Sequence, residues 1–206
     1  MDAFERMKRW VAANAPGVEL NPPAGAKEIA GVARAMRLKF PADLKSYLLT
    51  NDGQATDSHG FIGNWELLPL ASILEAWRFQ CKMAREGQFT PGNRNKPTTY
   101  VKGLWWNPRW IPLAHSADGD YFCLDTDPNE EGTPGQVILF RHDDVRRPLV
   151  ARSLGEWFAR IADDMESGLH KWVVDGEGYG RFDDEGFMLS SLQDQRGRTQ
   201  NVKRKT

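Results

Sequence analysis

Three apolar runs follow one another at residues 110–114, 121–124 and 136–141, and short polar stretches separate them. Short runs rich in aromatic and branched residues are typical of β-strands. Strands joined by short connections pair antiparallel, because a parallel pair needs a crossover of about a dozen residues or more. These runs therefore argue against a doubly wound parallel sheet and predict antiparallel hairpins.

Helical periodicity surrounds these strands. Apolar side chains recur at steps of three and four over residues 2–13, 26–38 and 40–49. The pair Ser72 and Glu75 has the spacing of a capping box and predicts the start of a fourth helix. A second capping box formed by Ser153 and Glu156 predicts the last strong helix.

This order of elements predicts an α+β fold. We expect a single domain with a mixed, mainly antiparallel sheet flanked by helices, with the N-terminal helices first. Residues 1–189 form that domain in this interpretation, and residues 171–189 are expected to add a hairpin or loop against the sheet. Residues 190–206 contain few apolar side chains, so they are expected to form a mobile basic tail.

The formal net charge of −1 hides an uneven distribution. Residues 1–40 and 191–206 are basic, whereas residues 41–190 carry an excess of acids. An acidic body repels phosphate backbones, so the main domain is not expected to bind nucleic acid. It favours a basic protein partner, because complementary potentials steer association.

Several absences limit where the chain works. No apolar stretch reaches the length of a membrane span, and the first residues lack the apolar core of a secretory signal. Only two cysteines occur, Cys81 and Cys123, and we expect both to be buried free thiols. These features favour the cytoplasm and no contact with membranes.

The densest acidic stretch runs from residue 118 to residue 131, on both sides of the second apolar run. Asp125, Asp127 and Asn129 copy the start of a calcium loop, but Glu130 and Gln136 stand where that loop needs glycine and glutamate. We therefore predict no metal site, and expect these side chains to bond their own backbone. No basic residue lies within this stretch, and its acids are Asp118, Asp120, Asp125, Asp127, Glu130 and Glu131.

No catalytic motif stands out. The four histidines lack metal-binding companions, and Cys123 lies in an apolar run, where a thiol is protonated and inert. The glycines of GEGYG at 176–180 lack the strand and helix of a dinucleotide loop. We predict no catalytic residue and no cofactor. A hydrolase that uses Cys123, with His115 or His142, or the acidic loop remains an alternative.

Tryptophan is concentrated before the first strand. Trp105, Trp106 and Trp110 lie within six residues of one another. Packing next to the sheet is the first interpretation of this cluster. The alternative is a partly exposed aromatic anchor of the kind that dominates protein interfaces.

The order of several short motifs resembles the SUKH superfamily. This family includes fungal cell-wall-assembly regulators and many bacterial toxin-immunity proteins. The resemblance covers about residues 25–170, and its most specific part is WNPRWIPL at 106–113. The other segments are FPADLKSYLL at 40–49, NDG at 51–53, WELLPL at 65–70, GQVI at 135–138 and SLGEWF at 153–158.

The resemblance implies an α+β domain that binds a partner and does not catalyse a reaction. We expect first an immunity protein that occludes the basic cleft of a toxin, such as a nuclease. The runner-up is a regulatory interaction protein in cell wall assembly or signalling. The expected partner-binding residues are Trp105, Asp118, Asp120, Glu130 and Glu131.

Overall fold

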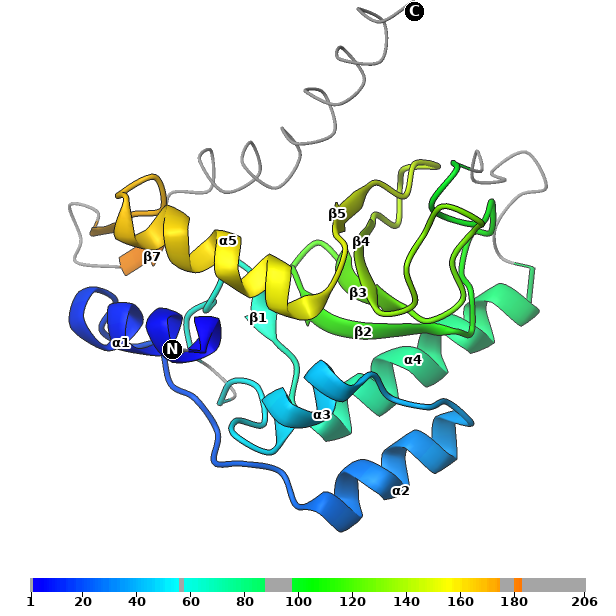
Figure 1. Cartoon of the computed structure of the whole chain (residues 1–206), viewed down its shortest axis with the longest axis horizontal. Helices are drawn as coiled ribbons and strands as arrows, with labels where there is room; N and C mark the ends of the chain where they lie inside the picture. Colours follow the sequence, from blue (N-terminus) through cyan, green and yellow to red (C-terminus); the bar gives the residue numbers. More distant parts are fainter. Residues whose placement is uncertain (1, 56–57, 88–97, 175–179, 183–206) are drawn as a thin grey trace, which may run out of the picture.

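The computed structural model describes residues 2–55, 58–87, 98–174 and 180–182 (Figure 1). The N-terminal half is mostly helical, and the strands follow it, as the sequence predicts. In chain order the elements are α1 (Ala3–Asn14), α2 (Ala26–Met36), α3 (Ala42–Leu48), β1 (Glu66–Leu67), α4 (Leu70–Arg85), β2 (Trp110–His115), β3 (Tyr121–Asp125), β4 (Gln136–Phe140), β5 (Leu149–Ala151), α5 (Leu154–Glu166), β6 (Trp172–Val174) and β7 (Gly180–Phe182).

The main sheet has five strands in the order β1-β2-β3-β4-β5. Every neighbouring pair is antiparallel, so the sheet is antiparallel throughout. This confirms the α+β prediction and the hairpins that the short connections required. Strands β6 and β7 pair antiparallel within the segment 171–189, but they form a separate two-stranded sheet near α1 and α5 and do not extend the main sheet as expected. Residues 88–97, 175–179 and 183–189 and the predicted tail at 190–206 lie outside the described residues.

The sheet is buried on both faces. Phe122 and Leu124 of β3 join the larger apolar core, whereas Cys123 between them joins a second, smaller core. This alternation follows from the two-residue period of a strand. The larger core takes in side chains of α1, α3 and α5, and the smaller core is closed by Trp106, Trp110 and the second half of α4.

The helices cover the sheet from different sides. Helix α5 packs against α1 and against the β4–β5 edge, while α4 runs along β2 (Figure 1). Helix α2 packs on α4 and lies at the rim of the molecule. The cap predicted for α5 is present, because the Ser153 hydroxyl accepts a hydrogen bond from the Glu156 backbone N–H at 3.1 Å.

Helix α4 begins earlier than the capping box predicts. It starts at Leu70 and not after Ser72. The Leu70 N–H donates to the carboxylate of Asp52 at 2.7 Å, so a residue distant in sequence satisfies the first turn. The spacing of Ser72 and Glu75 carries no information about Asp52, so the predicted start of α4 was wrong.

The segment Asn51–Gln54 joins the helical half to the sheet. Gly53 has a φ of +69°, and a Cβ added there would lie 2.5 Å from the backbone carbon of Leu68. Only glycine fits, because the backbone is left-handed and a neighbouring chain segment touches it. The backbone at Gly53 therefore packs directly against the backbone of Leu68 and Pro69, in the connection between β1 and α4. We call this contact the close crossing.

Gln54 organises the chain that leads into β1. Its side-chain carbonyl accepts from the backbone N–H groups of Phe61 at 2.9 Å and Leu67 at 2.7 Å. Its side-chain NH₂ donates to the backbone carbonyl of His59 at 2.6 Å. The segment between Gln54 and β1 has no regular β-sheet hydrogen bonding. The buried Gln54 side chain satisfies the backbone groups of this segment instead.

We predict that Gly53→Ala is much more destabilising than Gly119→Ala. Both glycines have positive φ, but a Cβ at Gly119 would meet nothing within 4 Å. Gly119→Ala is expected to cost about 1–2 kcal/mol of unfolding free energy from backbone strain alone. Gly53→Ala adds a clash and is expected to cost about 2–5 kcal/mol, which urea denaturation measures. Equal losses in the two variants would contradict the close approach.

Candidate protein-binding site

A hollow lies where the β2–β3 turn meets the loop that follows β4. Its volume is about 690 Å³. Trp65, next to β1, contributes an aromatic wall, and Asp118 and Asp120 come from the turn. Arg141 and Asp143 come from the loop after β4, so the rim carries charges of both signs. We call this feature the turn hollow.

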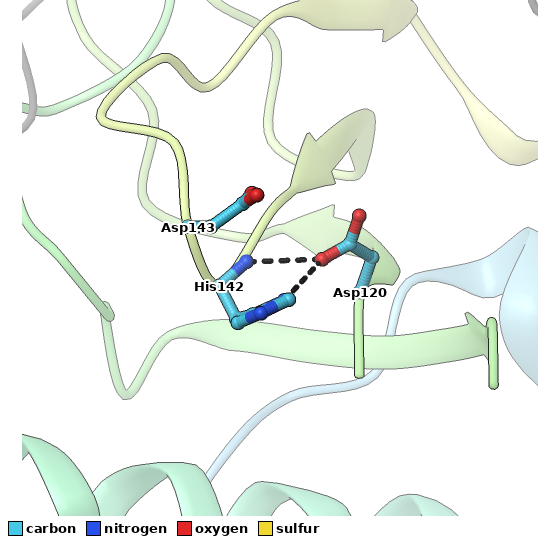
Figure 2. Close-up of side chains that lie close together, drawn as sticks. All are labelled: Asp120, His142 and Asp143. Atoms are coloured by element: carbon cyan, nitrogen blue, oxygen red, sulfur yellow. Dashed lines mark hydrogen bonds and ion pairs between the residues drawn. The ribbon is translucent and has the colours of Figure 1, made fainter. Parts of the chain in front are cut away.

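Asp120 holds the two sides of the turn hollow together (Figure 2). One carboxylate oxygen accepts from the His142 backbone N–H at 3.0 Å and lies 2.9 Å from His142 Nδ1. The other carboxylate oxygen is 4.0 Å from Arg141 Nε. Asp120 therefore braces the loop, and the exposed Asp118 is the turn's carboxylate that faces solvent.

Asp143 lies beside this pair, and ligand atoms of Asp120, His142 and Asp143 fall within 4.8 Å of one another. His142 and Asp143 are exposed, and within the described chain the group contains just these three residues. Calcium takes six to eight oxygen ligands and structural zinc takes four ligands, so three surface groups are an incomplete set for either ion. The three side chains therefore form a charged corner of the turn hollow.

The structure does not bring all five expected partner-binding residues together. Asp118 and Asp120 precede β3, whereas Glu130 and Glu131 lie in the loop after its other end. Both glutamates are exposed. The acids therefore form two separate groups at opposite ends of one strand.

Trp105 occupies a third position, against a buried arginine. Its ring lies 5.0 Å from the guanidinium carbon of Arg147, and the ring of Phe140 lies 4.4 Å from the same carbon. Trp106 and Trp110 are buried in the smaller core, as the packing interpretation predicted. Trp105 is half-buried and packs against the smaller core, and its use as a partner anchor stays a prediction.

Arg147 is a residue that sequence reasoning missed. It is 1% exposed, and its guanidinium donates to the backbone carbonyls of Trp105 at 3.1 Å and Arg146 at 2.9 Å. Burial lowers the pKa of Arg147 to about 10. Nothing distinguishes it in sequence from the exposed Arg146 beside it, because the aromatic faces that hold it come from other segments.

The loop that resembled a calcium site bonds its own backbone only in part: Asp125 does so, whereas the side chains of Asp127 and Asn129 bond to the segment 98–107. Asp125 is buried and accepts from the Asp127 backbone N–H at 2.9 Å and from Gln136 Nε2 at 3.0 Å. Asp127 in turn accepts from Lys102 Nζ at 2.6 Å, which lowers the pKa of its carboxyl. Burial raises the pKa of the Asp125 carboxyl. The carboxylates thus shape the loop.

The thiol considered as a nucleophile is inaccessible. Cys123 is fully buried, and desolvation raises the pKa of its thiol well above the usual value. His115 instead lies with its Nε2 3.0 Å from a carboxylate oxygen of Glu66. The turn hollow is lined by neither His115 nor Cys123. The hydrolase alternative therefore loses its thiol nucleophile.

Comparison with known proteins identifies the family. Residues 23–160, more than half of the chain, match the family model described as the SMI1 / KNR4 family (SUKH-1). The chain belongs to the SMI1/KNR4 (SUKH-1) family. The segments that indicated this family include Asn51–Gly53, whose role is structural, since Asp52 caps α4 and Gly53 permits the close crossing.

Three of the relatives found are fungal proteins named as regulators. The Schizosaccharomyces pombe "Cell wall biosynthesis/cell cycle regulator smi1" is 29% identical over 84% of this chain and 37% of the relative. The Neurospora crassa "Glucan synthesis regulatory protein" is 24% identical over 84% and 39%, respectively. The Saccharomyces cerevisiae "Cell wall assembly regulator SMI1" is 23% identical over 86% and 42%. The chain thus spans about two fifths of these relatives.

No helix in the described part of the chain has both the length and the apolar character needed to cross a bilayer.

We predict that Arg147→Ala destabilises the fold while the neighbouring Arg146→Ala does not. Truncating Arg147 opens a cavity against Phe140 and leaves buried carbonyls without donors, which is expected to cost about 2–4 kcal/mol of unfolding free energy. Arg146 is exposed and pairs with Asp144, so its loss is expected to leave the urea midpoint unchanged. Equal midpoints for both variants would show that Arg147 does not support the smaller core.

Proposed function

We propose that this chain is a non-catalytic protein-binding module that acts as a regulatory interaction protein in cell wall assembly. The observation that carries the proposal is the family match over residues 23–160, together with relatives named as cell wall regulators. This was the runner-up interpretation of the sequence, and the relatives' names favour it over toxin immunity.

The geometry of the site supports binding as the mode of action. Charged side chains line the turn hollow. The Asp120 carboxylate links the β2–β3 turn to the loop after β4, because it accepts a hydrogen bond from the His142 backbone N–H. Cys123, the nucleophile considered from sequence, is sealed in the core. A braced surface that carries charge suits recognition of another protein, because fixed charges select a partner and its orientation.

The proposal predicts that this chain replaces its counterpart in a regulator. A chimera is made in which this chain substitutes for the matching segment of the S. cerevisiae regulator SMI1. In cells that lack their own SMI1, the chimera is expected to restore growth under cell wall stress. The same chimera with Gly53→Val, which cannot form the crossing at Gly53, is expected not to restore it. A folded chimera at normal abundance that gives no growth would contradict the proposal.

Toxin immunity is a second candidate, because three of the expected contact acids face solvent. Asp118, Glu130 and Glu131 are exposed, and none forms an ion pair with any described residue. Exposed, unpaired carboxylates are what occlusion of a basic nuclease cleft requires. In this candidate the cytoplasmic chain would bind a basic toxin domain at one end of β3.

The immunity candidate is tested with a toxin domain whose gene lies beside that of this chain. If Asp118 contacts the toxin, Asp118→Ser is expected to weaken the complex about tenfold or more in a calorimetric titration. Glu130→Ser and Glu131→Ser test the other end of β3 separately. Glu75→Ser, an exposed acid on α4, is the matched control. Unchanged affinity in all three variants would exclude a contact through these three carboxylates.

A further inference from the structure

A second hollow surface of the molecule lies between helices. Two adjoining hollows of about 480 and 420 Å³ run between α2 and α3 and on toward the β3–β4 loop, and they share Lys39, Phe40 and Lys45. We call the pair the α2–α3 groove. Each volume lies within the roughly 300–1,000 Å³ typical of binding sites.

The floor of the α2–α3 groove is apolar. Small side chains on one side of α2, such as Ala30 and Ala33, leave the space open, and Leu38 and Phe40 form its base. Leu49 is 48% exposed beside it, although leucine is most often fully buried. The groove therefore presents apolar surface that gains free energy when it is covered.

The rim of the groove is basic. Arg34, Lys39 and Lys45 line it and are exposed, and Arg109 continues the line at the β3–β4 end. None of the described residues that line the two hollows is acidic. Arg34, Lys39 and Lys45 form no ion pair with any residue that the structure describes, so their charge is not neutralised within the described chain.

We propose that the α2–α3 groove binds an acidic amphipathic segment of a partner protein. Apolar side chains of that segment would fill the floor, and its carboxylates would meet Arg34, Lys39 and Lys45. A nucleic acid fits less well, because the floor offers apolar side chains where a phosphate backbone needs continuous positive charge. The inference rests on the proposed binding function and adds the chemical class of one partner.

The groove is tested with a defined probe. The probe is a labelled helical peptide of about 15 residues with leucine along one face and glutamate on the other, and its matched peptide carries lysine in place of glutamate. Fluorescence anisotropy is expected to show binding of the acidic peptide and none of the basic one. No binding of the acidic peptide, or a preference for the basic one, would overturn the proposal.

Variants of this chain locate the probe. Lys39→Glu combined with Lys45→Glu is expected to raise the Kd at least about tenfold, because the rim then repels the peptide. Ala30→Trp, at an exposed helical position, is expected to fill the floor and abolish binding without lowering the melting temperature. Lys171→Glu is the charge control, since Lys171 is exposed and follows α5. Equal Kd values for the double variant and this control would overturn the assignment.

Two further measurements test whether the α2–α3 groove instead binds nucleic acid or a second copy of this chain. Displacement of the peptide by duplex DNA at lower concentration would assign the groove to nucleic acid and overturn the proposal. A dimer in sedimentation that Ala30→Trp abolishes would place a second copy of this chain there, with the same consequence. If the Ala30→Trp chimera still restores growth under cell wall stress, the groove is not used but the proposed function stands.

Discussion

The close crossing of Asn51–Gln54 behind the β1–α4 connection is the constraint on which both candidate surfaces depend. Gly53 lets the two backbones touch, and Asp52 supplies the first N–H acceptor of α4. Gln54 then holds the chain that leads into β1, and that chain places Trp65 in the wall of the turn hollow. On the other side of the crossing, α3 ends at Leu48 and forms one wall of the α2–α3 groove.

The two surfaces carry different charges, which the formal net charge of −1 conceals. The turn hollow contains Asp118, Asp120 and Asp143 beside Arg141, whereas the described residues that line the groove include bases and no acid. In the proposed function, a basic partner and an acidic partner segment would bind at these separate places. The basic rim of the groove would repel a basic partner, whereas the turn hollow carries charges of both signs.

Much of the fold follows from local patterns in the chain. The apolar steps of α1 and α5 are visible in sequence because burial on one face imposes a helical period. The runs of β2, β3 and β4 are visible because both faces of these strands are buried, which makes the runs almost continuously apolar. The start of α4 and the bracing role of Asp120 are not visible. Their partners, Asp52 and His142, lie 18 and 22 residues away along the chain. Arg147 is hidden for the same reason, since its environment is assembled from Trp105 and Phe140.

The sequence by itself determined the fold class, the antiparallel pairing and the buried state of Cys123, because these depend on neighbours along the chain. It also carried the resemblance that the family match confirms. Only the tertiary structure decided that the acids expected to contact a partner lie at two ends of β3, that Asp120 braces a loop, and that bases surround an apolar groove. A surface is made of residues from several elements, so its shape and charge exist only once those elements are packed.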